Sequence, residues 1–246
     1  MDFFTNLEDL KGSGIPAALC TIIETGGSTP RKAGTKMIVR IDSKTFGSVG
    51  GGQLEMEVIK DAIEVINTRI PSFNTYRAGK EGQGECRIFI EALPVKNPLI
   101  IFGAGHVGRA LAGVAVNYGF LPVLVDPRQN ISGKITIDGS EIKNMDYLES
   151  VDTLETDDKT YIVVCTPSHD IDAQLIYRCS GIPHAYLGMI GSRKKVDEAI
   201  HFLEKKGLSK AAIDSIDMPV GVPINCETPE EIAISILARL IDIKNS

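Results

Sequence analysis

The sequence predicts an α/β fold in two domains, a C-terminal doubly wound parallel sheet and a smaller N-terminal mixed α/β domain. Two observations support this prediction. Residues 94–98 place two prolines and two polar residues between apolar runs, which is typical of a domain boundary. Beyond them, short continuous apolar runs alternate with helix-like segments, as expected for parallel strands buried on both faces. We therefore assign residues 1–93 to the first domain and residues 98–246 to the second.

The first domain is predicted to contain three strands and a helix. The strands lie at residues 17–24, 36–41 and 87–93, with a turn at residues 42–44. Residues 54–66 carry apolar side chains at helical spacing, which predicts the helix.

The second domain is predicted to begin with a buried strand at residues 99–102. A glycine turn follows, and then a helix to about Tyr118 with Gly119 as its C-cap. Further strands are expected at residues 120–125 and 161–165.

The last helix has clear start signals. Thr228 suits the N-cap, Pro229 the first helical position and Glu231 the capping-box position. Its apolar row consists of Ile232, Ile236 and Leu240. Such a helix is mostly buried, either in its own domain or at a subunit interface, and we expect a homodimer.

The turn after the first strand of the second domain has the spacing of a dinucleotide-binding motif. Gly103, Gly105 and Gly108 follow a strand and open a helix, and Asp126 ends the next strand. In this context the first glycine permits the turn, the second admits a pyrophosphate and the third lets helix and strand pack closely. The second domain is therefore predicted to be Rossmann-like.

Three further roles are predicted around this turn. Asp126 would bind ribose hydroxyls, and Arg128 would accommodate a phosphorylated ribose. His106 would contact a phosphate or cap the helix. The alternative is a Rossmann-like domain that keeps the turn without binding a dinucleotide.

A second glycine cluster lies in the first domain. Gly50, Gly51 and Gly52 precede a predicted helix, so they form a candidate anion site. Arg31 and Lys36 would supply the cations. The alternative is a pair of glycine-rich turns beside a solvated basic loop.

Two more polar segments follow predicted strands of the second domain. His169 is a candidate proton donor or phosphate ligand, oriented by Asp172, at the sheet edge where ligands bind in such folds. Ser192 and Arg193 form a candidate anion site at the start of another helix. In the alternative interpretation, both segments are solvent-exposed helix starts.

Charge and cysteine usage exclude several classes of protein. The formal net charge of −6 argues against a nucleic-acid partner. Five scattered cysteines predict neither a disulfide framework nor a metal site, and they suit a reducing cytoplasm. No apolar run is long enough for a membrane span.

Taken in order, these motifs resemble the xanthine dehydrogenase accessory family of the XdhC and CoxI type. The matching segments are residues 27–31, 47–55, 103–108, 126–128, 188–195 and 228–233. The resemblance adds Gln53 and Glu55 to the candidate cofactor-binding residues.

This resemblance implies an accessory role in the maturation of molybdenum hydroxylases such as xanthine dehydrogenase. Family members are thought to bind the molybdenum cofactor, as molybdopterin or its dinucleotide, and to assist its sulfuration with a cysteine desulfurase. They then deliver it to the apo molybdenum hydroxylase. We expect a cofactor-binding chaperone rather than a catalyst. The chain lacks iron–sulfur cysteine spacing and is too short to be a xanthine dehydrogenase itself.

Many members of this family carry a Cys-Gly-Gly segment at the end of the first domain. Here Cys86 is present without the glycines, so it is a candidate sulfur carrier, with a buried strand cysteine as the alternative. We expect the cofactor to lie between the two domains. The rival hypothesis is an NAD(P)-dependent oxidoreductase, with NAD(P) or FAD on the glycine turn and His169 as acid or base. A third hypothesis is a redox-sensing module that NAD controls.

Overall fold

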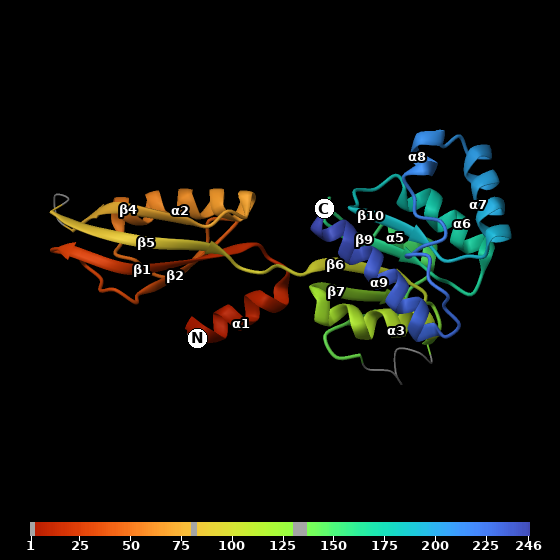
Figure 1. The fold of residues 1–246 in the computed structure, drawn as a ribbon, viewed down its shortest axis with the longest axis horizontal. Coiled ribbons are helices and arrows are strands. Elements are labelled where there is room, and N and C mark those ends of the chain that lie inside the picture. Colours follow the sequence, from red (N-terminus) through yellow and green to blue (C-terminus); the bar gives the residue numbers. More distant parts are fainter. Residues whose placement is uncertain (1–2, 80–82, 130–136) are drawn as a thin grey trace. The chain divides into compact units, whose positions relative to one another are not determined.

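A computed structural model describes residues 3–79, 83–129 and 137–246. The chain divides into two compact units, Met1–Lys96 and Asn97–Ser246, and the division falls inside the predicted linker. Each unit contains a five-stranded sheet (Figure 1). Among the described residues, no helix is both long and apolar enough to cross a membrane.

The N-terminal unit is built on an antiparallel sheet with the strand order β3-β2-β1-β5-β4. Its strands are β1 (Ala17–Gly27), β2 (Lys36–Arg40), β3 (Thr45–Gly47), β4 (Ser72–Ala78) and β5 (Gly84–Ala92), and its helices are α1 (Phe3–Ser13) and α2 (Gly52–Thr68). The three predicted strands and the predicted helix are confirmed, whereas α1, β3 and β4 were not predicted.

Helix α2 covers one face of this sheet because its apolar residues share one side of the helix (Figure 1). The buried positions are Leu54, Val58, Ala62, Val65 and Ile66. On the other face, Leu10 of α1 packs with Ile38 of β2 in a smaller cluster. The N-terminal unit therefore has a core of its own.

The C-terminal unit is built on a fully parallel sheet with the strand order β10-β9-β6-β7-β8. Its strands are β6 (Asn97–Phe102), β7 (Phe120–Val125), β8 (Glu141–Lys143), β9 (Tyr161–Val164) and β10 (Tyr186–Met189). Its helical segments are α3 (His106–Ala115), the 3-10 turn η2 (Val116–Tyr118), α5 (Tyr147–Val151), α6 (His169–Cys179), α7 (Arg193–Lys205), α8 (Lys210–Asp214) and α9 (Pro229–Asn245).

Both faces of the parallel sheet are covered, as the sequence predicts. Helices α3 and α9 contribute to the core on one face, and α5, α6 and α7 to the core on the other (Figure 1). The capping box of Thr228 and Glu231 at the start of α9 is confirmed. Gly119, with a φ of 85°, follows η2 in the left-handed conformation expected of a C-cap.

The strand order fixes where a ligand site belongs. Strand β6 is central, with β7 and β8 following outward on one side and β9 and β10 on the other. The chain therefore reverses direction across the sheet between β6 and β9, which is the switch point at which Rossmann folds bind ligands.

Candidate functional site

A cleft of about 690 Å³ lies at the carboxyl edge of the parallel sheet. The segments after β6, β7, β9 and β10 form it, together with the first turn of α9. Its lining includes six residues that the sequence singled out, namely Gly105, His106, Arg128, His169, Asp172 and Ser192. This volume is within the usual range of small-molecule sites. The structure thus brings four separate predicted segments into one site.

The glycine turn after β6 has the predicted division of roles. Gly103 has a left-handed φ of 110°, and a Cβ there would collide with the backbone of Cys165. A Cβ at Gly108 would collide with the carbonyl oxygen of Gly103. At Gly105, however, a Cβ would meet no atom within 4 Å, and this residue lines the cleft. The first and third glycines therefore serve packing, while the second leaves room for a ligand.

The helices that begin at the cleft differ in how their N-termini are satisfied. The N-caps of α3 and α7, Gly105 and Ser192, give no side-chain hydrogen bond, and neither helix has an acidic residue in its first turn. Helix α6 also lacks a side-chain cap, but Asp170 and Asp172 lie in its first turn. Helices α5, α8 and α9 are capped by Asp146, Ser209 and Thr228.

Helices α3 and α7 therefore present N–H groups and the positive ends of their dipoles without any acidic or capping side chain of their own. Of the helices described in the C-terminal unit, these two alone combine both features. Because residues of both N-termini line the cleft, this part of it suits an anion such as a phosphate.

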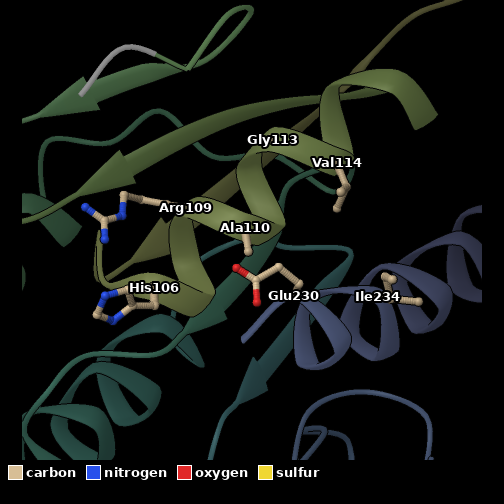
Figure 2. Close-up of a pocket in the computed structure, with 7 residues that line it drawn as sticks. All are labelled: His106, Arg109, Ala110, Gly113, Val114, Glu230 and Ile234. Carbon is tan, nitrogen blue, oxygen red and sulfur yellow. The ribbon is translucent and has the colours of Figure 1, made fainter. Parts of the chain in front are cut away.

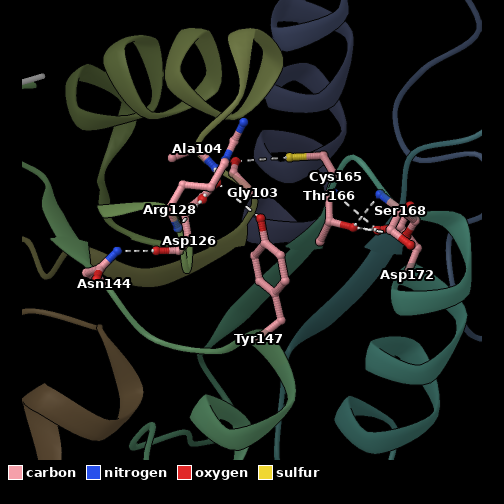
Figure 3. Close-up of polar contacts among 10 residues, drawn as sticks. All are labelled: Gly103, Ala104, Asp126, Arg128, Asn144, Tyr147, Cys165, Thr166, Ser168 and Asp172. Carbon is pink, nitrogen blue, oxygen red and sulfur yellow. Dashed lines mark hydrogen bonds and ion pairs between the residues drawn. The ribbon is translucent and has the colours of Figure 1, made fainter. Parts of the chain in front are cut away.

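Asp126, at the end of β7, is buried against the glycine turn (Figure 3). Its Oδ2 accepts hydrogen bonds from the Ala104 N–H at 2.9 Å, Arg128 Nη2 at 2.7 Å and the Tyr147 hydroxyl at 3.1 Å. Its Oδ1 accepts from the N–H and the Nε of Arg128 at 3.1 and 2.8 Å. A carboxylate offers about four acceptor sites. The structure therefore corrects the predicted ribose-binding role of Asp126, because protein donors already use both oxygens.

Ionisation of Asp126 is stabilised by the same contacts. Burial opposes ionisation, but the hydrogen bonds from Arg128 and from the Ala104 N–H outweigh it and lower the pKa of this carboxyl. The hydrogen bond to Asp126 in turn raises the pKa of Arg128. Arg128 lines the cleft while paired with Asp126, so it would have to leave that carboxylate to bind a phosphorylated ribose.

The segment after β9 is held by Asp172. Its Oδ1 accepts hydrogen bonds from the Thr166 N–H at 3.1 Å and the Thr166 hydroxyl at 2.7 Å (Figure 3). His169 lies at the rim, about half exposed, with its Nδ1 4.0 Å from Asp172 Oδ2. This separation is an ion-pair distance and too long for a hydrogen bond, so the predicted orientation of His169 by Asp172 is a loose contact.

The third segment contributes Lys195 as well as Ser192. Lys195 lines the cleft, but Arg193, which the sequence favoured, does not. Lys195 follows Arg193 and Lys194 directly, and the sequence did not single it out. All three lie in the first turn of α7, and helix geometry turns only part of that turn toward the sheet edge.

His106 is the first residue of α3 and does not cap it, because the N-cap is Gly105. It lines the cleft and also a second hollow of about 400 Å³ between α3 and α9 (Figure 2). There Glu230 and the exposed Ile234 of α9 face Gly113 of α3. His106 is thus placed where it can reach a ligand in the cleft.

The glycine cluster of the N-terminal unit is already occupied by an acidic side chain. The Glu55 Oε1 accepts hydrogen bonds from the N–H groups of Gly50 at 3.3 Å and Gly51 at 3.0 Å, and from the Ser48 hydroxyl. Burial opposes ionisation, but these hydrogen bonds, that of Ser48 first, lower the pKa of Glu55. The structure therefore corrects the predicted anion site, because Glu55 itself is the anion that these two N–H groups bind.

A polar hollow of about 720 Å³ does lie beside this cluster. Its lining includes Arg77 and four of the candidate cofactor-binding residues, Gly50, Gly51, Gly52 and Gln53. Gln53 donates a hydrogen bond to Glu57 at 3.0 Å. The predicted cations are not in its lining: Arg31 is exposed, and Lys36 donates a hydrogen bond to the Thr21 hydroxyl.

Cys86 lies in β5 with no exposed surface, inside the core between the sheet and α2. Burial raises the pKa of its thiol. A sulfur carrier must meet its partner as a thiolate at the surface, so the structure supports the alternative interpretation of Cys86 as a buried strand cysteine. Cys20 and Cys179 are buried too.

The strand order, the glycine turn and the cleft define the C-terminal unit as a Rossmann-type domain. The chain belongs to the XdhC and CoxI family: the XdhC Rossmann domain matches residues 99–240, and the XdhC and CoxI family model matches residues 10–77.

Two curated relatives are similar in sequence. The uncharacterized protein YqeB of Escherichia coli is 31% identical over 258 residues, which cover 100% of this chain and 47% of YqeB. A probable xanthine dehydrogenase subunit of Bacillus subtilis is 25% identical over 158 residues, which cover 64% of this chain and 46% of that protein. The chain therefore spans about half the length of the curated relatives it matches.

A solved structure has the same fold. The crystal structure of a xanthine dehydrogenase from Bacillus halodurans aligns with a TM-score of 0.56 at 21% sequence identity. The alignment covers 100% of this chain and 96% of that one.

Proposed function

We propose that this chain is an accessory protein for the maturation of molybdenum hydroxylases of the xanthine dehydrogenase type. It binds the molybdenum cofactor, as molybdopterin or its dinucleotide, in the cleft of the C-terminal unit. Support comes from its family and from the Bacillus subtilis relative, whose name places it in a xanthine dehydrogenase.

One observation carries the proposal: two helix N-termini without caps or acidic residues line the same cleft. A phosphate of the cofactor would accept hydrogen bonds from the N–H groups of these two helix N-termini, and Lys195 would add a positive charge. The apolar side chains of Val107, Ile190 and Ile232 line the cleft too and suit the flat face of a pterin. The bound cofactor supplies the metal centre for the client enzyme, while this chain binds and shields it.

Sulfuration of the cofactor is assigned to a partner cysteine desulfurase. Three of the five cysteines are buried, and burial raises the pKa of the cleft residue Cys165 to about 12. These four thiols are protonated or inaccessible at neutral pH, so they are poor sulfur carriers. The chain would present the cofactor to the desulfurase and then to the apo molybdenum hydroxylase.

The second candidate is an NAD(P)-dependent oxidoreductase. It is favoured by the glycine turn and by His169, a half-exposed proton donor at the cleft. The residue that this motif would offer to the ribose, Asp126, is instead engaged with protein donors at both oxygens. We therefore place this function second.

The test is cofactor binding by the Gly105→Asp variant. Gly105 is an N-cap with a φ of −72° and open space at its Cβ, so Asp fits without strain and would cap α3. Its carboxylate would also repel a phosphate in the cleft. We expect native mass spectrometry to show molybdopterin bound to the unsubstituted chain and absent from the variant, with an unchanged or higher Tm.

Gly113→Asp is the matched control. Gly113 lies on the same helix with equally open space, but it lines the α3–α9 hollow and not the cleft. The Gly113→Asp variant should bind the cofactor as the unsubstituted chain does. Binding of NAD by the unsubstituted chain, with hydride transfer and no pterin binding, would contradict the accessory function.

A further inference from the structure

Asp172 is a buried carboxylate with one oxygen left over. The residue is 3% exposed, yet it lines the cleft. Both hydrogen bonds from Thr166 go to Oδ1. Within the described part of the chain, Oδ2 accepts no hydrogen bond, and the His169 ring nitrogen stays 4.0 Å away.

This arrangement leaves Oδ2 available to a ligand in the cleft. Burial raises the pKa of Asp172 despite the opposing hydrogen bonds from Thr166 and the opposing electrostatic effects of the neighbouring His169 and Lys195. A carboxylate oxygen that receives no hydrogen bond from the protein can accept one from a donor on a ligand in the cleft.

The cleft therefore offers two chemically different kinds of polar group, and the segment that carries Asp172 follows β9, which lies between β6 and β10 in the sheet. At the N-termini of α3 and α7 it offers N–H donors without acids, which suits phosphate. At the N-terminus of α6 it offers the acidic oxygen of Asp172, which repels phosphate and needs a donor. Apolar residues, among them Pro167 and Ile190, also line it. A ligand that carries a phosphate, a flat apolar face and an N–H donor matches these three kinds of group.

We propose that Asp172 Oδ2 accepts a hydrogen bond from the amino-pyrimidinone edge of the bound pterin and so selects the heterocycle. This inference rests on the proposed cofactor binding, and it assigns that site a specificity-determining residue. Guanine has the same amino-pyrimidinone edge, so a guanine nucleotide is the other ligand that offers these N–H donors together with a phosphate.

The experiment compares the full chain with Asp172→Asn and Asp170→Asn in calorimetric titrations. Asp172→Asn keeps an amide oxygen for the Thr166 donors but turns an NH₂ group toward the ligand. Asp170→Asn removes an equal charge from the same helix turn at an exposed position outside the cleft lining. The probes are hydroxymethylpterin diphosphate, the corresponding lumazine with a carbonyl in place of the amino group, GDP, and pyrophosphate alone.

We expect Asp172→Asn to weaken pterin diphosphate binding by about tenfold or more, the effect of one hydrogen bond to a charged group. Pyrophosphate affinity should be unchanged or higher, and the Tm of the free variant unchanged or higher, because a costly buried charge is gone. The unsubstituted chain should prefer pterin over lumazine. Asp170→Asn should behave like the unsubstituted chain.

Three results would overturn the inference, and they differ from failure of the proposed function. Equal pterin affinity in Asp172→Asn, or equal binding of pterin and lumazine, removes the role of Asp172 while leaving cofactor binding intact. If GDP binds and pterin diphosphate does not, the ligand that Asp172 recognises is a guanine nucleotide. If neither molybdopterin nor pterin diphosphate binds the unsubstituted chain, the proposed function itself is wrong.

Discussion

At the scale of single residues, Asp126 joins the glycine turn to the rest of the sheet edge. It connects Ala104, Arg128 and Tyr147, which come from three different segments. Replacing it with Asn removes the charge and leaves an NH₂ group facing donors. We expect Asp126→Asn to lower the free energy of unfolding by about 2 kcal/mol, the usual worth of hydrogen bonds to a charged group. Urea denaturation of the two proteins measures this.

The same residue makes a prediction about pH. The pKa of Asp126 is lower in the folded chain than its ordinary value of 3.8. The folded state therefore binds fewer protons than the unfolded state, and the stabilisation is full above the unfolded pKa and is lost as pH falls through the folded one. The stability difference between the unsubstituted chain and Asp126→Asn should shrink in this acid range. A difference independent of pH would show that packing, and not charge, causes it.

Sequence position found Asp126 but not its role. The residue was predicted because it ends the strand after the glycine turn, and it does. Its hydrogen-bond partners lie 22 residues earlier and 21 residues later, and only the folded sheet edge brings them together. Cys86 illustrates the same limit. The local sequence around one cysteine in an alternating strand is the same whether its side chain faces solvent or packs, as here, against helix α2.

At the scale of elements, the helices α3 and α7 that begin at the cleft differ from the other helices of the C-terminal unit in having N-termini without a capping or acidic side chain. Ser192 is the N-cap of α7 but makes no capping hydrogen bond. An Asp there would accept the free N–H groups and favour the dipole, so Ser192→Asp should stabilise the chain by about 0.5–1 kcal/mol. The same carboxylate should weaken pyrophosphate binding. Thermal unfolding and calorimetry measure the two effects.

Ser209→Asp is the control for that prediction. Ser209 already caps α8 by accepting the Ala212 N–H at 3.2 Å, and it lies outside the cleft lining. Ser209→Asp should leave pyrophosphate binding unchanged. It should change the free energy of unfolding by no more than a few tenths of a kcal/mol. If Ser192→Asp bound pyrophosphate normally, the N-terminus of α7 would not be part of the anion site.

Prediction of the elements themselves depended on how strongly each is patterned. Strand β7 was predicted at its observed bounds because it is a continuous apolar run, the pattern typical of a parallel strand. Strands β4 and β8 were missed because both are sheet edges with polar, half-exposed sequences. The strand order was beyond prediction from local patterns, since it depends on which strands pair over long distances. The polarity of the cleft, with its bare helix starts and Asp172, follows from that order.

At the scale of the whole molecule, each unit has its own hydrophobic core. We therefore expect two unfolding transitions, which core substitutions can assign. Val58→Ala in α2 and Leu111→Ala in α3 each truncate a fully buried side chain. Each substitution should lower the free energy of unfolding of its own unit by about 2–4 kcal/mol. The transition of the other unit should keep its temperature. Calorimetric scans of the two variants check this, and a single shared transition would show that the units unfold together.

With the transitions assigned, ligand binding locates the site. A ligand that contacts only the folded C-terminal unit stabilises that unit by about 2.7 kcal/mol at a hundredfold excess over Kd. The proposed cleft uses residues of β6 through α9 alone, so molybdopterin should raise only the transition that Leu111→Ala lowers. The sequence favoured a ligand held between the two domains, and that arrangement requires the other transition to rise as well. A shift in both transitions would therefore contradict a site made by the C-terminal unit alone, and a shift in one would support cofactor binding by the Rossmann-type unit.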